Sequence, residues 1–355
     1  MELGETVVTP PDPNRPASTP MTLDEVAAAT GFSRTTVRFV VNGQAERYRI
    51  KAQTRDQIEQ FIREHGIVID RTARSLRLQR SDAIGLVLPD LANPFFAHLT
   101  AALEDLCHAA GLVLLTTSSH DDPAGEARAV TRLLERGVDG MVIAPCSPRI
   151  ALPPSGGRRS CAVVMTDRAF PGQPYPVVVT DNEAAGYRLA DILLAERGDA
   201  VFLAASRWLP SIEERIRGFL SACGKYGLDD AEARVFSSES DDVAAGRRLM
   251  EQAIASRGGL PRAFVCSSLL MFEGALQAIG VRNGRLPPDL LLGTFDHHPL
   301  LEFLPNRVVS ARQDEKAIAR TIFRCLTDQL KNRPVHAERL VVEGHIWRNG
   351  NLDDK

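Results

Sequence analysis

Several polar side chains follow the ends of short apolar segments, where they could bind a small hydroxylated or anionic molecule. Asp167 and Arg168 follow the apolar residues 161–166, and Asp296 follows 290–295. A guanidinium can hold a phosphate through two hydrogen bonds, and a carboxylate can accept hydrogen bonds from two neighbouring hydroxyl groups. Phe95, beyond the segment 83–88, could stack on a sugar face, although an aromatic at such a position as often only packs.

The elements that must position these side chains alternate between short apolar strands and amphipathic helices, which predicts an α/β fold with parallel sheets. Ligands of such sheets bind beyond the C-terminal ends of the strands. The expected strands are 83–88, 112–117, 140–144, 161–167, 200–204, 263–266 and 290–295, and the expected helices are 95–110, 125–136, 182–197, 212–226, 242–256, 269–283 and 315–331. The alternative for Asp167 and Arg168 is a plain ion pair at the edge of a lobe.

A different pattern precedes this region, because residues 21–42 predict two short helices joined by a tight turn. Thr22 and Glu25 have the spacing of a capping box at the start of the first helix. Gly31 stands where that helix must end, since glycine adopts a positive φ at little cost. Ser33 can then cap the second helix, which we expect at 34–41.

The second of these helices has an inward and an outward side. Val37 and either Val40 or Val41 face inward, which leaves polar and aromatic side chains outside, namely Arg34, Thr35, Arg38 and Phe39. This is the layout of a helix-turn-helix, whose second helix presents its side chains to base edges in the major groove. An ordinary helical hairpin would share the pattern.

Several spaced motifs also follow one another in the order found in a known protein family. TLDEVAAATGFSRTTVRFVVNG, IGLVLPDLANPFFAHL, RGVDGMVIAP, VVMTDR, SIEERIRGF and LLGTFDHHPLLEFL follow one another as in the lactose repressor (LacI) family of transcriptional regulators. The chain resembles this family from Met21 to its end, and SRTTVRFVVNGQAERYRI is especially similar to the fructose-repressor type. No single motif would identify the family, but the order of all of them is specific to it.

The resemblance implies a domain organisation with a helix-turn-helix and a two-lobed core of the periplasmic-binding-protein type. The expected parts are a disordered, proline-rich tail at 1–20, a helix-turn-helix domain at 21–69, a hinge helix at 70–80 and a core at 81–350. Within the core we expect a first lobe at 81–180 and 312–333 and a second lobe at 181–311 and 334–350.

The helix-turn-helix pattern and the resemblance together assign functional residues. Those expected to bind DNA are Thr22, Ser33, Arg34, Thr35, Thr36, Arg38, Phe39, Asn42, Arg49, Arg74 and Leu76, with Leu76 entering the minor groove from the hinge. Those expected to bind the effector are Phe95, Asp167, Arg168, Arg215, Asp296 and Gln313. The sequence departs from the family at two places. Ile67-Val68-Ile69 precedes the hinge where the family usually has a proline and an asparagine, and His297 replaces a second aspartate.

The function implied is a repressor of sugar metabolism that a sugar phosphate releases from double-stranded operator DNA. Resemblance to the fructose-repressor type implies fructose 1-phosphate, and the alternative is a repressor that responds to sucrose or fructose. We expect a homodimer on a pseudo-palindromic operator, with a tetramer left open. No cofactor is expected, and motifs of common enzymes, such as GxSxG or a P-loop, are absent from the sequence.

Composition is compatible with this expectation. The net charge is −3, yet residues 22–80 hold eleven Lys or Arg against seven Asp or Glu, which gives a basic module on an acidic body. The sequence has no apolar run of 18 residues, no secretory signal and no metal-ligand spacing among its six cysteines and eight histidines. These absences argue against a membrane protein and an exported sugar-transport protein, and predict the cytoplasm, at the nucleoid.

Overall fold

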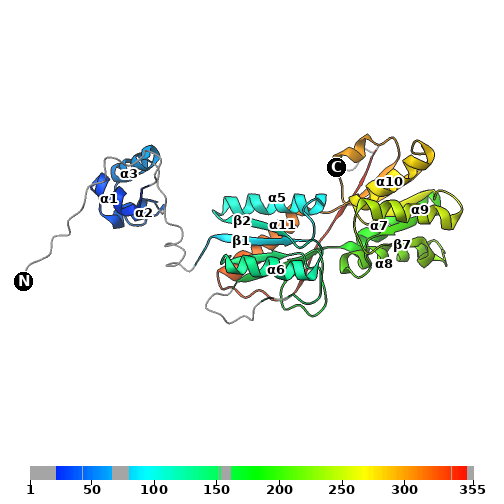
Figure 1. The fold of residues 1–355 in the computed structure, drawn as a ribbon, viewed down its shortest axis with the longest axis horizontal. Helices are drawn as coiled ribbons and strands as arrows, with labels where there is room; N and C mark the ends of the chain where they lie inside the picture. The colour runs from blue at the N-terminus through cyan, green and yellow to red at the C-terminus, as the bar shows by residue number, and fades with distance from the viewer. Residues whose placement is uncertain are drawn as a thin grey trace, which may run out of the picture. The chain divides into compact units, whose positions relative to one another are not determined.

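The computed structural model describes residues 21–41, 43–65, 80–150, 152, 161–336 and 338–349. The chain forms two compact units, Met1–Ser81 and Asp82–Lys355, each of which is considered by itself (Figure 1). Three expectations lie outside the described residues: the tail at 1–20, Asn42, and the hinge with Arg74 and Leu76.

The N-terminal unit contains three helices, α1 (Leu23–Thr30), α2 (Arg34–Val41) and α3 (Ala52–His65). The expected capping box at α1 is confirmed, because Thr22 accepts a hydrogen bond from the Glu25 amide at 3.3 Å and its own amide donates to the Glu25 carboxylate at 2.6 Å. Gly31 ends α1 with a φ of 71°. Ser33 caps α2 by accepting from the Thr36 amide at 3.1 Å.

The core of this unit lies between the three helices. Val26 of α1, Val37 and Val40 of α2 and Ile58 of α3 are buried together. Val37 and Val40 are therefore the inward-facing residues of α2, whereas Val41 is only partly buried. The opposite side of α2 carries no part of this core.

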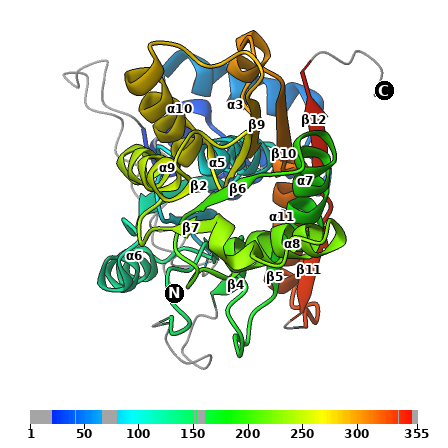
Figure 2. The ribbon, with the colours of Figure 1, turned by 90° about the vertical axis from the view of Figure 1, so that its right-hand side faces the viewer.

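The second unit has two six-stranded sheets, one in each lobe (Figures 1 and 2). The first has the order β11-β5-β4-β3-β1-β2 and the second β12-β10-β9-β8-β6-β7. All the pairs are parallel except β10 with β12. The strands are β1 (Ala83–Leu88), β2 (Val113–Ser118), β3 (Gly140–Ile143), β4 (Ala162–Thr166), β5 (Val177–Thr180), β6 (Val201–Ala204), β7 (Val235–Ser237), β8 (Ala263–Cys266), β9 (Leu291–Phe295), β10 (Val308–Arg312), β11 (Arg339–Val342) and β12 (His345–Arg348).

Helices cover both faces of each sheet, as expected for parallel strands joined by crossovers. In the first lobe, α5 and α11 lie on one face and α6 on the other, and in the second lobe α7 and α8 lie opposite α9 and α10 (Figures 1 and 2). Their bounds are α5 (Pro94–Ala109), α6 (Pro123–Glu135), α7 (Asn182–Arg197), α8 (Pro210–Lys225), α9 (Val243–Arg257), α10 (Leu269–Asn283) and α11 (Glu315–Leu330), with short 3-10 helices η1 (Ala231–Arg234) and η2 (Pro299–Phe303).

The expected boundary of the second lobe needs one correction. We expected all of 334–350 in the second lobe, but β11 pairs with β5 in the sheet of the first lobe, and only β12 joins the second sheet. The last described crossing between the lobes therefore lies at Glu343 and Gly344. The sequence misled because β11 is four residues long and its side chains alternate between exposed and half-buried, so no apolar run marks it.

Candidate functional site

An aspartate ends a central strand in each lobe, and the two stand in equivalent backbone positions. Asp167 follows β4 and Asp296 follows β9, and both have a φ of 64°. The amide of Asp167 donates to the carbonyl of Val178, and the amide of Asp296 to that of Ala311, each at 3.0 Å. Aspartate tolerates this left-handed conformation better than most residues. The turn sets both carboxylates at the C-terminal edge of their sheets.

Burial and several neighbouring groups affect the pKa of the Asp296 carboxyl. Burial raises the pKa of its carboxyl, the Arg215 guanidinium and a hydrogen bond from Gln313 oppose this rise, and the charge of Asp167 adds to it. Asp167 belongs to the first lobe and Asp296 to the second, so these two carboxylates lie close to each other across the junction of the lobes, which we call the cleft. A ligand there could receive groups from both lobes at once.

Arg215 is fixed by hydrogen bonds in the second turn of α8. Its Nε donates to Oδ1 of Asn182 at 2.8 Å, and its Nη1 donates to the carbonyl of Ser267 at 2.6 Å. The guanidinium lies 4.2 Å from the centroid of the Phe295 ring, and the residue is only 4% exposed. Asn182 begins α7, so α7, α8 and the end of β8 together position this charge.

Arg168 makes contacts within the first lobe but keeps one donor. Its Nη1 donates to Asp121 at 2.6 Å and to the carbonyl of Pro145 at 3.3 Å. Its Nε lies 3.7 Å from Oδ2 of Asp167, which is too far for a hydrogen bond. The ion pair between Asp167 and Arg168, which was the alternative to ligand binding, is therefore a loose one. This Nε is buried without a hydrogen-bond partner among the described residues. A buried unpaired donor beside a cleft favours an anionic or hydroxyl oxygen as its missing partner.

Gln313 joins Asp296 to another crossing between the lobes. Its Nε2 donates to Oδ1 of Asp296 at 2.7 Å, and its Oε1 accepts from the hydroxyl of Thr180. Thr180 ends β5 just before the chain enters the second lobe, and Gln313 follows β10 just before it returns to the first. The bonds therefore link a carboxylate of the cleft to two of the segments that cross between the lobes.

Phe95 is placed differently from the other five residues expected to bind the effector. It is 4% exposed, belongs to the core of the first lobe, and packs edge-on against Phe96 with the ring centroids 5.1 Å apart. This position favours the packing alternative over stacking on a sugar. Arg168, Arg215, Asp167, Asp296 and Gln313 remain as the polar set.

Asp241 is a carboxylate of the cleft that the sequence reasoning missed. It follows the three-residue strand β7 and accepts a hydrogen bond from the hydroxyl of Ser268. Desolvation raises its pKa to about 6, with a further rise from Asp296 and opposing effects of Ser268, Arg215 and Arg168. In sequence it lies within SSESDD, which has the composition of a solvated loop.

Asp241 should make the stability of the two-lobed unit depend on pH. Because its pKa is raised on folding, its contribution favours the folded state below the usual aspartate pKa and is lost as the pH rises through about 6. Asn at this position keeps an acceptor for Ser268 without the charge. We expect Asp241→Asn to raise the free energy of unfolding by about 1 kcal/mol at pH 7.5 and by less at pH 4.5. The effect is modest because the Asp241 side chain is partly exposed to solvent.

The neighbouring Asp242 serves as a control, because its pKa is shifted in the opposite direction. It caps α9, and hydrogen bonds led by the Ala245 amide lower its pKa. Asp242→Asn should therefore lower the free energy of unfolding at pH 7.5 or leave it unchanged, as measured by urea denaturation. Equal effects of the two substitutions at both pH values would contradict a desolvated Asp241.

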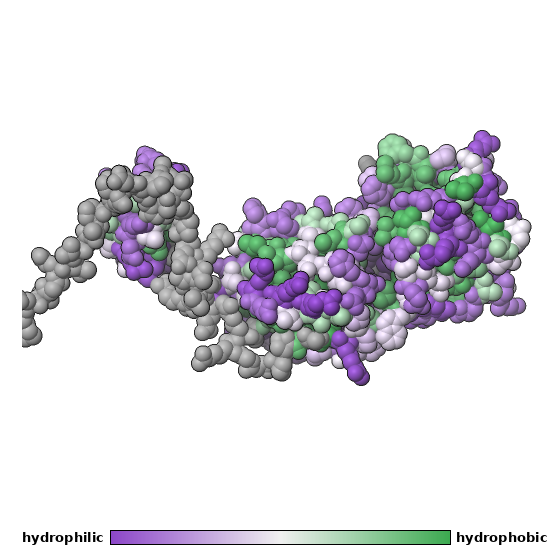
Figure 3. Space-filling model, in the orientation of Figure 1, coloured by the Kyte–Doolittle hydropathy of each residue, from purple (hydrophilic) through white to green (hydrophobic). Residues whose placement is uncertain are grey.

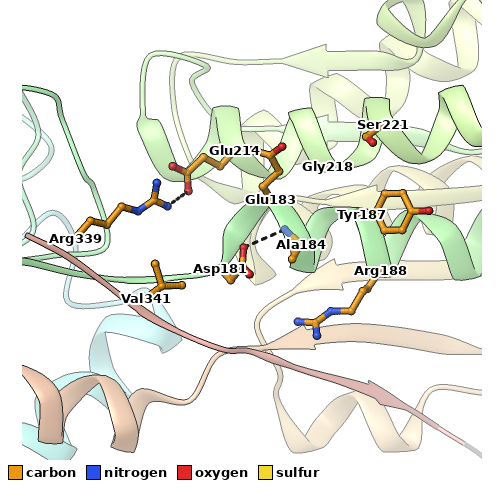
Figure 4. Close-up of a pocket in the computed structure, with 10 residues that line it drawn as sticks. All are labelled: Asp181, Glu183, Ala184, Tyr187, Arg188, Glu214, Gly218, Ser221, Arg339 and Val341. Carbon is orange, nitrogen blue, oxygen red and sulfur yellow. Dashed lines mark hydrogen bonds and ion pairs between the residues drawn. The ribbon is translucent and has the colours of Figure 1, made fainter.

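A groove of about 630 Å³ lies elsewhere on the second unit, between α7, α8 and β11 (Figure 4). None of the six residues expected to bind the effector lines it. Its charged side chains are engaged, since Arg339 pairs with Glu214 at 2.8 Å and Arg188 pairs with Glu343 at 2.9 Å. The Arg339–Glu214 pair joins β11 of the first lobe to α8 of the second, which indicates a structural role for this surface.

On the N-terminal unit, three of the residues expected to bind DNA use their hydroxyls as caps or beside a cap. Thr22 and Ser33 cap α1 and α2, and the Thr36 hydroxyl lies 2.9 Å from that of Ser33. Thr35 is exposed, and Arg34 pairs with Asp24 at 3.0 Å while both side chains stay in solvent. Such a surface pair is weak enough for DNA to replace it.

The remaining residues expected to bind DNA lie near the end of α2 and in the loop after it. Arg38 and Phe39 are half-buried, and Arg49 is exposed with a φ of 53°. The Phe39 ring stacks on Tyr48, which the sequence reasoning did not select.

None of the helices described is long and apolar enough to cross a membrane. Across the same residues, no group of three or more His, Cys, Asp or Glu side chains comes together in a way that could hold a metal ion.

Comparison with known proteins identifies what the chain is similar to. Residues 84–332 match the family of the periplasmic binding protein domain. The chain is 31% identical to the fructose operon regulatory protein of Vibrio cholerae, over 84% of this chain and 91% of the relative, and 29% identical to the catabolite repressor/activator of Salmonella typhimurium, over 85% and 90%. The crystal structure of the Cra transcriptional dual regulator of Pseudomonas putida in complex with fructose 1-phosphate is 26% identical, with a TM-score of 0.67 over 76% of this chain and 99% of that one.

Proposed function

This chain belongs to the LacI family of transcriptional regulators, with a core of the periplasmic-binding-protein type, and we propose that it is a repressor of sugar metabolism which fructose 1-phosphate releases from its operator. The family membership makes it a regulator rather than an enzyme. The proposed effector rests on the chemistry of the cleft and on the fructose 1-phosphate held by a related regulator.

The observation that carries the proposal is the convergence of polar groups from both lobes. Asp296 and Asp241 offer acceptors for sugar hydroxyls, and Arg215 presents a fixed guanidinium beside them. Arg168 on the opposite lobe has a buried Nε without a hydrogen-bond partner among the described residues. A sugar phosphate would satisfy that donor with its anionic end and the carboxylates with its hydroxyls.

Regulation then requires that the effector bind one lobe arrangement more tightly than the other. We propose that fructose 1-phosphate favours closed lobes and that closure weakens operator binding through the hinge that contains Leu76. Effector and operator must then weaken each other by the same factor, since the coupling free energy is reciprocal.

A homodimer would present two helix-turn-helix units to a pseudo-palindromic operator. Supporting it are three strongly exposed apolar side chains of the second lobe, Val281 of α10 and Leu300 and Phe303 of η2. Figure 3 shows an apolar patch on this lobe. Exposed apolar patches of this kind mark association surfaces. We propose this patch as part of the dimer interface.

The deciding experiment is calorimetric titration of the purified protein with fructose 1-phosphate, fructose 1,6-bisphosphate, fructose and sucrose, with Arg168→Ala measured alongside. We expect fructose 1-phosphate alone to bind tightly and the variant to bind it at least about 30-fold more weakly, because a charge-assisted contact contributes about 2 kcal/mol or more. Binding of the phosphate ester by the variant as tightly as by the parent would contradict the role of Arg168.

A second candidate effector is an unphosphorylated sugar. Both arginines of the cleft already have partners within the protein, and Asp167, Asp241 and Asp296 give the cleft more carboxylates than guanidiniums. Neutral hydroxyl groups could be the partners of these carboxylates without bringing in a further negative charge. Tight binding of fructose or sucrose, indifferent to Arg168→Ala, would assign the chain to the type of repressor that responds to those sugars.

A further inference from the structure

Two aromatic rings stack outside the core of the DNA-binding unit. The rings of Phe39 on α2 and Tyr48 in the following loop have centroids 3.6 Å apart and planes inclined by 10°. Neither ring belongs to the apolar core formed by the three helices, which packs on the opposite side of α2 around Val37 and Val40. The pair therefore covers part of the outward side of the proposed recognition helix.

The loop that carries Tyr48 is fixed to the end of α2. The amide of Gln44 donates to the carbonyl of Phe39 at 2.8 Å, and the amide of Tyr48 donates to that of Gln44 at 3.2 Å. Ala45 is buried in the core of the unit, and its carbonyl accepts from the amide of Ile50 at 2.9 Å. Tyr48 is nevertheless 47% exposed, so its ring shields one face of Phe39 without being enclosed itself.

A guanidinium lies near each ring of this aromatic pair. The guanidinium of Arg38 lies 5.0 Å from the centroid of Phe39, and that of Arg47 lies 5.8 Å from the centroid of Tyr48. Phe39 follows Thr35 by four residues, so both lie on one side of α2. The surface is thus an apolar ring edge beside a hydroxyl side chain, flanked by cations that complement phosphates.

Major-groove edges offer few apolar groups to such a surface. The 5-methyl group of thymine is the apolar feature there, and phenylalanine is among the side chains that contact it. We infer that Phe39, held in place by Tyr48, reads a thymine methyl group in each half of the operator, while Arg47 contacts a nearby phosphate. The inference rests on the proposed DNA-binding function and assigns Tyr48 as a positioning residue.

The test begins with duplexes that the full-length protein selects from a random DNA library. Each thymine of the selected site is then replaced in turn by deoxyuridine, which lacks only the methyl group, and affinity is measured by fluorescence anisotropy. We expect one thymine in each half-site whose replacement weakens binding by the wild-type protein about fourfold, the factor for one buried methyl group. Phe39→Ala should bind the thymine and deoxyuridine duplexes equally, and Phe39→Leu should retain part of the difference.

Variants of the loop separate positioning from direct contact. Tyr48→Phe preserves the stacked pair and should keep the deoxyuridine effect, whereas Tyr48→Ala should lose it. Arg47→Ala should weaken operator and random DNA by the same factor and reduce the salt dependence by about one ion, as expected for a phosphate contact. Circular dichroism of each variant checks that the helices remain.

The outcomes distinguish this inference from the function on which it rests. If the library yields a preferred sequence but no deoxyuridine replacement matters, or if Phe39→Ala stays as sensitive as the wild type, the methyl contact is wrong and DNA recognition stands. If the library yields no preferred sequence, sequence-specific DNA binding itself fails.

Discussion

Replacing Gly218 by alanine is expected to lower the free energy of unfolding of the two-lobed unit by about 3 kcal/mol. A Cβ at Gly218 of α8 would overlap the carbonyl oxygen of Glu183 and lie 2.5 Å from the amide nitrogen of Tyr187, both in α7. Backbone atoms cannot turn aside as a flexible side chain can, so α7 and α8 would have to separate. Gly186 of α7 makes the reciprocal close approach, to the carbonyl of Arg215.

The matched control lies on the same helix. Gly224 of α8 has no atom within 4 Å of the position that a Cβ would take. Gly224→Ala should therefore raise the free energy of unfolding by about 0.5–1 kcal/mol, because alanine loses less conformational entropy in a helix. Urea denaturation of both variants measures the difference, and equal changes would show that α7 and α8 are not held together as closely as the structure has them.

Gly218→Ala should also weaken binding of the effector. α8 carries Arg215, whose contacts with Asn182 and Ser267 fix its guanidinium beside the cleft. Separation of the helices would stretch the bond to Asn182, because that residue begins α7. We expect folded Gly218→Ala protein to bind fructose 1-phosphate more weakly than Gly224→Ala protein.

The second large effect is expected from Asp296→Asn, which should weaken binding of fructose 1-phosphate about 100-fold. A carboxylate can accept hydrogen bonds from two sugar hydroxyls, each worth about 1.5 kcal/mol or more, whereas asparagine offers one acceptor oxygen. Its Oδ1 can still accept from Gln313. Because burial penalises the charge that the substitution removes, the free energy of unfolding should stay within about 1 kcal/mol of the parent value.

Calorimetry with fructose 1-phosphate and release of a selected operator duplex both measure this effect. Asp90→Asn is the control, since Asp90 is an exposed carboxylate beyond β1 that accepts a hydrogen bond from the amide of Ala92. It should bind the effector like the parent protein. Parental affinity in Asp296→Asn would show that the carboxylate does not bind the sugar.

The amino-acid sequence by itself determined the elements whose signals are local. Strand 83–88 and helices 182–197 and 269–283 were predicted with the bounds that the structure has, because an apolar run or stripe ends at a capping residue or a glycine. Thr22, Ser33 and Gly31 likewise predicted α1 and α2, since capping depends on residues three or four positions apart.

The motifs also selected most of the polar residues that the structure brings to the cleft. Asp167, Arg168, Arg215 and Asp296 stand at strand ends or at the start of the helix that follows a strand, and parallel sheets gather those positions at one edge. Gln313 was selected as well, but its bond to Asp296 became visible only in the tertiary structure.

Other features were decided by the tertiary structure alone. β5, β7, β10, β11 and β12 have three to five residues each and were not predicted. β7, β11 and β12 contain no buried apolar run, because their formation depends on a neighbouring strand, whereas β5 and β10 are short buried runs that were missed. The return of β11 to the first sheet has the same cause.

The clearest examples are side chains whose meaning depends on a distant partner. Asp241 looks like a loop carboxylate until burial in the folded chain desolvates it and the Ser268 hydroxyl donates to it, and Tyr48 looks like a loop aromatic until its ring meets Phe39. Local patterns encode helix ends and strand runs because their interactions span a few residues. Pairing between segments far apart in sequence leaves no such periodic trace, so only the folded chain reveals it.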